Sequence, residues 1–207
     1  PFYGEGGGQV GDSGVLEAEG VSVDVIDTTK HEGVYLHRAV VGEGTLNVGD
    51  SLVAKVDSSR RGAIMRNHTA AHLLQAALRE VLGSHVEQAG QLVNDRHVRF
   101  DFTHFSALTA EELVQVEMLV NQEILKGVPV SMVEMPIEEA RKSGAMALFG
   151  EKYGDVVRVV SVEDGFSKEF CGGTHMDNTA RLGLFKIISE SSVASGVRRI
   201  EGVTGMG

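Results

Sequence analysis

A change in the spacing of apolar residues near residue 58 constrains the fold of this chain more than any other feature. From that point to Leu82, apolar side chains recur at three- and four-residue steps, which is the period of an amphipathic helix. Ser58 and Ser59 are candidate N-caps, and Gly83 is a candidate C-terminal stop. The pattern predicts one long helix that ends at Leu82.

The segment before this helix has the pattern of short strands. β-branched residues gather at 15–16, 21–26, 35–41 and 51–56, and Gly, Asp and Asn residues separate these runs. Short strands at this spacing are typical of a small barrel or a curled sheet. We therefore predict a β-rich, barrel-like subdomain over residues 1–58 that contains the glycine-rich start of the chain.

The rest of the chain alternates between the two patterns. A capping box of Thr109 and Glu112 predicts a helix to Lys126, and Pro136 opens a short helix to Lys142. Strands are predicted at 86–93, 98–102, 128–134, 156–162, 184–192 and 197–204. The expected fold class is α+β: an α/β sandwich over residues 59–207 follows the first subdomain, and the last three strands complete its sheet.

Composition limits the functions that are open to the chain. A formal charge of −10 disfavours a general nucleic-acid binder, because phosphate contacts need a positive surface. Any RNA contact would depend on local basic clusters, which are Arg60, Arg61 and Arg66; Arg96, His97 and Arg99; and Arg198 and Arg199. The single cysteine, Cys171, excludes an internal disulfide and suits a reducing cytoplasm.

Neither a membrane span nor a secretory signal is expected. No apolar run approaches the roughly 20 residues that cross a bilayer. No basic-then-apolar segment opens the chain. The first residue is Pro1 rather than an initiator methionine, so we expect a piece of a longer polypeptide.

Two pairs of potential metal ligands stand far apart in the sequence. His68 and His72 are four residues apart in the long helix, so both imidazoles face one side of it and can reach a common ion. Cys171 and His175 have the same spacing in a segment whose two glycines permit a tight backbone path. Such a nitrogen and sulfur set favours zinc over magnesium or calcium. Hydrogen-bonded histidines and a buried thiol are the simpler interpretation of each pair.

Longer motifs carry a specific resemblance. They are PFYGEGGGQVGD at 1–12, RNHTAAHLL at 66–74, LVND at 92–95, RFDF at 99–102, ALFGEKYGD at 147–155, SKEFCGGTH at 167–175 and SGVRRIE at 195–201. In this order, and over nearly the whole chain, they resemble the editing domain of bacterial-type alanyl-tRNA synthetases. Freestanding trans-editing proteins and the editing domain of threonyl-tRNA synthetase are related to it. The resemblance implies the editing fold that the two synthetases share.

This resemblance implies a deacylase. The family's domain hydrolyses the ester that links serine or glycine to the terminal adenosine of tRNA(Ala), while another domain of the parent protein ligates alanine to that tRNA with ATP and Mg²⁺. A second site is needed because a pocket for alanine discriminates poorly against glycine, which lacks one methyl group, and against serine, which has one additional hydroxyl group. The implied partners are the acceptor end of mischarged tRNA(Ala) and the other domains of the synthetase, in the cytoplasm and without a membrane.

The resemblance also implies one zinc ion per chain, held by His68, His72, Cys171 and His175. Four protein ligands ordinarily mark a structural site. Either one ligand is therefore loose, or the ion orders the pocket and orients the substrate without generating hydroxide. Cys171 is also a candidate catalytic residue, although a zinc-bound thiolate is poorly available as a covalent nucleophile.

Further pocket residues are expected around these ligands. Gln88 is expected to bind the serine hydroxyl or to steady the attacking water, and Thr69 is a second catalytic candidate. Gly7, Gly8 and Gln9 are expected beside the substrate, where backbone amides of a glycine segment can approach closely. Without the resemblance, Gln88 would be an exposed loop residue and the glycine segment a flexible turn.

Two more segments are candidates for substrate contact. Arg198 is expected to face the tRNA acceptor, and alternation along a strand would send Arg199 to the opposite face. Residues 147–153, with Lys152, are expected at the pocket entrance. A solvated charge and a packed turn are the simpler interpretations of these two segments.

Other functions stay open or are disfavoured. A freestanding deacylase would have the same chemistry, and a tRNA-binding module with structural zinc would bind tRNA without deacylating it. A zinc peptidase is disfavoured because Thr69 stands where such an enzyme has its glutamate base, and a nuclease is disfavoured by the acidic balance. The glycine segment lacks the lysine of a P-loop, which argues against nucleoside triphosphate binding.

Overall fold

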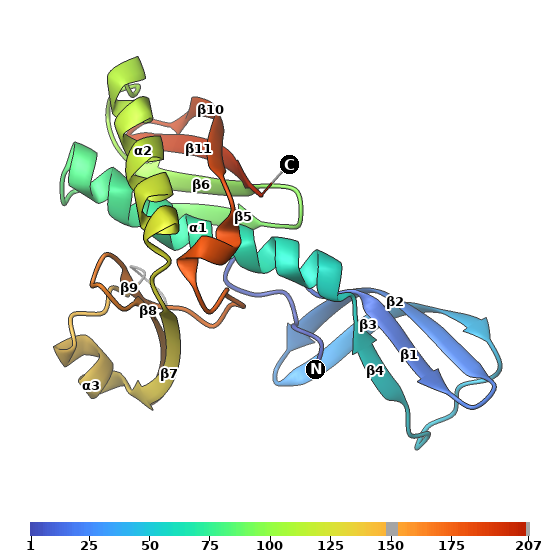
Figure 1. Cartoon of the computed structure of the whole chain (residues 1–207). Coiled ribbons are helices and arrows are strands. Elements are labelled where there is room, and N and C mark those ends of the chain that lie inside the picture. Colours follow the sequence, from blue (N-terminus) through green and yellow to red (C-terminus); the bar gives the residue numbers. More distant parts are fainter. Residues whose placement is uncertain (148–152, 206–207) are drawn as a thin grey trace.

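A computed structural model describes residues 1–147 and 153–205 of the chain, and this part contains three antiparallel sheets and three α-helices. Figure 1 shows α1 (Ser58–Leu82) running from the first sheet into the body of the molecule, where α2 (Ala110–Lys126) crosses it. The third sheet and α3 (Ile137–Lys142) form a separate lobe beneath α1 in this view. The combination of helices with antiparallel sheets confirms the predicted α+β class.

The long helix α1 is confirmed, but its N-cap is Asp57 rather than a serine. The Asp57 side chain accepts a hydrogen bond from the backbone N–H of Arg60 at 2.9 Å. Both an aspartate and a serine can accept a free N–H at this position. Only the aspartate also complements the positive end of the helix dipole with a negative charge. Gly83 ends the helix as predicted, and its N–H donates to the carbonyl of Arg79.

Among the described residues, none of the helices combines the length and the apolar character that a membrane span requires.

The first sheet has the order β3-β2-β1-β4. Its strands are β1 (Gly14–Ala18), β2 (Val21–His31), β3 (Val34–Glu43) and β4 (Val53–Val56). Among the described residues no pairing joins β3 to β4, so the sheet is open and the predicted barrel-like closure is not present. Closure needs the two edge strands to pair along their length. The four residues of β4 are too few to cover the ten of β3.

The second sheet, with the order β10-β11-β6-β5, packs against α1 and α2. Its strands are β5 (Gln88–Val93), β6 (Val98–Thr103), β10 (Phe185–Ala194) and β11 (Val197–Thr204). Phe100 and Ile200 are fully buried beneath the helices and join Leu74 of α1 in the main core. The strands predicted at 86–93 and 98–102 are present as β5 and β6, which pair as a hairpin. Asn94 stabilises its turn, because the Asn94 side-chain oxygen accepts two backbone N–H groups.

The third sheet corrects another prediction. Residues 156–162 were expected to share a sheet with the last two strands, whereas β8 (Val156–Val162) pairs with β7 (Val130–Pro136) and β9 (Lys168–Phe170). Both edges of β11 are occupied by β10 and β6, so β8 does not pair with β11 directly. At three residues β9 is too short to show a period, and it had not been predicted.

The N-terminal segment contacts both the first and the second sheet. The carbonyl of Val93 in β5 accepts the N–H of Val10, and the N–H of Val93 donates to Gly8. Asp12 forms an ion pair with Arg61 of α1. The glycine segment therefore bridges the two parts of the chain, and a division into subdomains near residue 58 stays a prediction.

Candidate metal centre

Four potential metal ligands meet where α1 faces the segment that follows β9. Their ligand atoms all lie within 4.8 Å of one another, and the residues are His68, His72, Cys171 and His175. Cys171 Sγ lies 3.4 Å from His68 Nε2 and 3.2 Å from His175 Nε2. The fold thus brings together the two pairs that the sequence places far apart.

This close approach depends on a glycine. A Cβ atom on Gly173 would lie 2.1 Å from His68 Cε1 and 2.8 Å from Gln9 Oε1, distances at which atoms overlap. The Gly173 N–H also donates to Cys171 Sγ at 3.4 Å. Gly173 is therefore required for the packing of the loop against the His68 ring.

Two polar side chains orient the histidine rings from behind. Gln9 Oε1 lies 2.7 Å from His68 Nδ1 and accepts the N–H of Thr174 at 2.8 Å. Thr69 Oγ1 lies 3.2 Å from His175 Nδ1 and accepts a backbone N–H of the same loop at 3.0 Å. Partners on Nδ1 hold each ring so that its Nε2 points at Cys171, as the outer contacts of metal-binding histidines do.

Burial and mutual charge determine the protonation of the cluster. Burial opposes the charged form of Cys171, yet the imidazoles of His68 and His72 hold the pKa of this thiol well below its usual value. Burial and the charge of His68 lower the pKa of His175 to about 3. Cys171 and His175 therefore present unprotonated donor atoms, which are the forms that bind a metal ion.

His72 lies beside a buried carboxylate. Burial would lower the pKa of His72, but the nearby charges of Glu169 and Cys171 raise it to about 9. Its Nδ1 lies 3.8 Å from Glu169 Oε2. Glu169 in turn accepts a hydrogen bond from Ser167 at 3.1 Å. The negative charges of Glu169 and Cys171 therefore favour the protonated form of the His72 ring.

Two of the separations within the cluster are close to those of tetrahedral zinc. Tetrahedral zinc, with Zn–N distances of about 2.0–2.1 Å and Zn–S of about 2.3 Å, separates its ligand atoms by roughly 3.3–3.6 Å. The sulfur–nitrogen separations of 3.2 and 3.4 Å are close to that range. The four side chains can therefore hold a metal ion, and their nitrogen and sulfur donors suit zinc.

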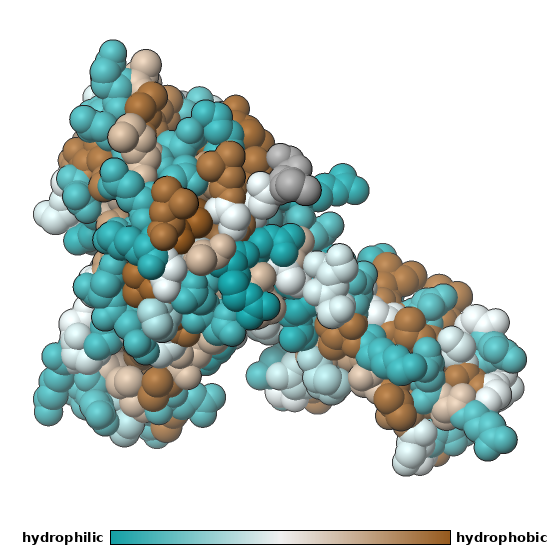
Figure 2. Space-filling view, viewed as in Figure 1, coloured by the Kyte–Doolittle hydropathy of each residue, from teal (hydrophilic) through white to brown (hydrophobic). Residues whose placement is uncertain are grey.

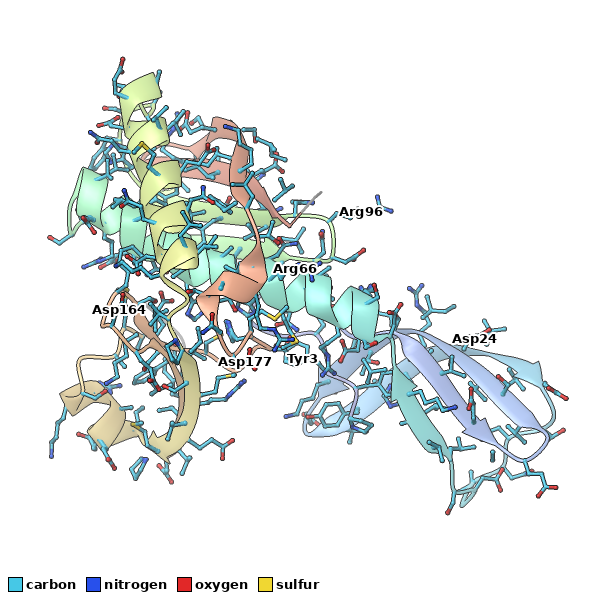
Figure 3. All side chains as sticks on the ribbon, viewed as in Figure 1. Tyr3, Asp24, Arg66, Arg96, Asp164 and Asp177 are labelled. Atoms are coloured by element: carbon cyan, nitrogen blue, oxygen red, sulfur yellow. The ribbon has the colours of Figure 1, made fainter. Side chains whose placement is uncertain are left out.

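A cavity of about 310 Å³ opens onto this cluster. His68, His72 and Cys171 form part of its wall, together with Gly7 of the N-terminal segment and Gln88 of β5. Figure 2 shows a recess between the first sheet and the lobe of the third sheet, and Figure 3 shows Tyr3, another lining residue, at this junction beneath α1. Segments that lie far apart along the chain therefore build one cavity.

Four other predicted site residues are not among the described residues that line this cavity. Gln9 and Thr69 are buried behind the histidines, as described above. The backbone of Gly8, at φ +82°, packs against Gln91. Arg198 does not line the cavity; its guanidinium donates to Glu190 at 2.6 and 2.8 Å.

The predicted entrance segment is only partly described. Ala147 and Tyr153 both line the cavity, and their position at its entrance stays a prediction. Residues 148–152, which include Lys152, lie outside the described residues.

Two family models match separate parts of the chain. Residues 157–201, which contain Cys171 and His175, match the model described as threonyl and alanyl tRNA synthetase second additional domain. Residues 1–60 match the model of class II (A) tRNA synthetases. The helical histidines lie between the two matched segments.

Similarity to curated proteins over the whole length of this chain decides the family. The chain is 60% identical over 206 residues to the alanine–tRNA ligase of Acetivibrio thermocellus, with 99% of the chain covered. It is 53% identical over 208 residues to that of Bacillus subtilis and 53% identical over 206 residues to that of Bordetella petrii. The chain belongs to the alanyl-tRNA synthetase family. It spans only 23% or 24% of the length of these relatives.

Within this alanyl-tRNA synthetase segment, the structure adds lining residues that the sequence analysis did not single out. Gln75 is one helical turn beyond His72, on the same face of α1, and Glu169 lies two residues before Cys171. Met146 also lines the cavity. The i, i+3 spacing of Gln75 from a ligand was the one available signal, whereas nothing in the sequence indicates that Glu169 and Met146 pair across a β-bridge.

Proposed function

We propose that this segment is an aminoacyl-tRNA deacylase that hydrolyses the ester of Ser-tRNA(Ala) and Gly-tRNA(Ala). The observation that carries the proposal is the position of the His and Cys cluster on the wall of a cavity of about 310 Å³. This volume is at the lower end for small-molecule sites, which suits the acylated end of a tRNA rather than a bulky ligand. Membership of the alanyl-tRNA synthetase family supports the choice of substrate.

The proposed mechanism depends mainly on positioning, because an aminoacyl ester is already labile. A zinc ion held by His68, His72, Cys171 and His175 would supply a Lewis acid that orients the aminoacyl group. Gln88 lines the cavity, where its amide is able to bind either the serine hydroxyl or the attacking water. Gln9 and Thr69 act as positioning residues for the histidine rings, and Cys171 acts as a ligand rather than a nucleophile.

The proposed partners are the acceptor end of tRNA(Ala) and the remaining parts of a longer synthetase, whose ligation of alanine would use ATP and Mg²⁺ elsewhere. Five arginines that were candidates for phosphate contact are engaged in ion pairs, namely Arg60 with Asp95, Arg61 with Asp12, Arg198 with Glu190, and Arg99 and Arg199 with Asp101. Acidic partners compensate the charge of these arginines, so we assign most of the binding of the tRNA body to other domains. A cytoplasmic location belongs to the same proposal.

A tRNA-binding module with structural zinc is the second candidate. It is favoured by the number of protein ligands, since four normally close the coordination sphere of zinc. That module would retain Ser-tRNA(Ala) without hydrolysing it. A freestanding deacylase would share the proposed chemistry and differ only in its polypeptide context.

A deacylation assay distinguishes these functions. The segment is expected to release serine and glycine from tRNA(Ala) and to spare Ala-tRNA(Ala), at a rate reduced by weak tRNA binding. The combined change Cys171→Ala with Gln88→His should abolish serine release, because it removes a metal ligand and a lining amide. Binding without hydrolysis would support the structural module, and undiminished activity of the double variant would refute the site assignment.

A further inference from the structure

A buried amide on the cavity wall is left with an unused hydrogen-bond acceptor. Gln75 is only 2% exposed and lines the cavity, and its Nε2 donates to the sulfur of Met146 at 2.8 Å. Its Oε1 is buried and has no hydrogen-bond partner among the described residues. A buried carbonyl oxygen without a partner is unfavourable, so this atom is suited to a donor that a ligand brings.

The surroundings of Gln75 indicate which donor fits. It follows His72 by three residues on the same face of α1, so its amide lies beside the metal-ligand cluster. Glu169 lines the same cavity and forms a β-bridge with Met146, the residue that Gln75 contacts. A carboxylate is the better partner for the α-ammonium group of an aminoacyl ester, whereas a neutral amide oxygen suits a neutral donor such as a hydroxyl.

We propose that Gln75 Oε1 accepts a hydrogen bond from the side-chain hydroxyl of the serine ester. This inference rests on the proposed deacylase function and adds a residue that determines specificity. A site built around a substrate hydroxyl rejects an analogue without it, because the buried acceptor is then left unpaired. Alanine lacks the hydroxyl and would leave the amide oxygen unpaired, while glycine leaves additional space for a water molecule that pairs with it.

The test combines a change in the protein with a change in the substrate. 2-Aminobutyrate has nearly the shape of serine, with a methyl group in place of the hydroxyl. The wild-type segment is expected to hydrolyse Ser-tRNA(Ala) about tenfold faster than 2-aminobutyryl-tRNA(Ala), the effect of one buried hydrogen bond. Gln75→Met keeps the length of the side chain and removes the acceptor, so it should abolish this preference and slow Ser-tRNA(Ala) hydrolysis about tenfold more than Gly-tRNA(Ala) hydrolysis.

Gln115→Met is the matched control, because Gln115 lies on α2 in a different groove, and it should keep the serine preference. The inference is overturned if Gln75→Met keeps the preference, or if it slows serine and glycine release by the same factor. Should the Met variant fail to fold, Gln75→Glu retains an acceptor oxygen and is expected to keep the preference; its loss would count against the inference. Failure of the wild type on all three substrates would instead refute the deacylase function.

Discussion

At the scale of single residues, a glycine controls how closely the two halves of the metal centre approach. We predict that Gly173→Ala disrupts the centre, because the new Cβ would overlap His68 and must displace either the ring or the loop. Overpacking of this kind costs about 1–3 kcal/mol of unfolding free energy. Denaturant unfolding and the zinc content of the purified protein measure the two effects.

The neighbouring glycine provides the control for this prediction. A Cβ on Gly172 would meet no heavy atom within 4 Å, so Gly172→Ala should keep both its zinc and its stability. Equal behaviour of the two variants would show that the contact with His68 does not matter.

Residue-scale contacts also separate two groups of predicted pocket residues. Gln88 and Gly7 line the cavity, whereas Gln9 and Thr69 contact the far sides of the His68 and His175 rings. The motifs indicate that these residues belong to the site. They do not indicate whether a side chain faces the ligand or supports a residue that does.

At the scale of elements, α2 begins with the capping box that its sequence predicts. Thr109 accepts the N–H of Glu112 at 3.1 Å, and Glu112 accepts the N–H of Thr109 at 2.8 Å. We predict that Thr109→Ala lowers the free energy of unfolding by about 1 kcal/mol, since it removes the cap of a helix that packs against α1. Chemical denaturation monitored by circular dichroism measures this change.

Ser106→Ala is a suitable control for the cap. Ser106 is an exposed residue just before α2, and no hydrogen bond of its side chain is found among the described residues. Its removal should change the free energy of unfolding by less than about 0.5 kcal/mol. A loss as large as that of Thr109→Ala would mean that the cap itself contributes little.

At the scale of the whole molecule, a metal ion would tie α1 to a loop that follows it by about a hundred residues. We predict one zinc per chain by elemental analysis. Its removal by a chelator should lower the thermal midpoint by roughly 5–10 °C, because binding at a hundredfold excess over Kd stabilises the folded state by about 2.7 kcal/mol. His68→Ala combined with His72→Ala should lose the zinc and should no longer respond to the chelator.

A second pair of histidines supplies the control for metal binding. His85 and His104 stack against each other outside the cluster, with 2.9 Å between Nε2 and Nδ1. Replacing both with alanine should leave one zinc per chain. A variant without His68 and His72 that still carried one zinc would place the ion elsewhere.

The sequence alone determined the elements whose signals are local. The period of apolar residues specified α1, the capping box specified α2, and the i, i+4 spacing of two pairs indicated the metal ligands. Each of these signals depends on residues that are close together along the chain, where backbone geometry fixes which side chains share a face.

Only the tertiary structure decided which edges pair and which polar groups share a cavity. It left the first sheet open, placed β8 in a third sheet, and brought Gln75, whose Oε1 has no hydrogen-bond partner among the described residues, to the wall of the metal cluster's cavity. These outcomes depend on contacts between segments far apart in the sequence, such as Gln9 with Thr174. No local pattern encodes them, because the stability of each contact depends on what else packs around it.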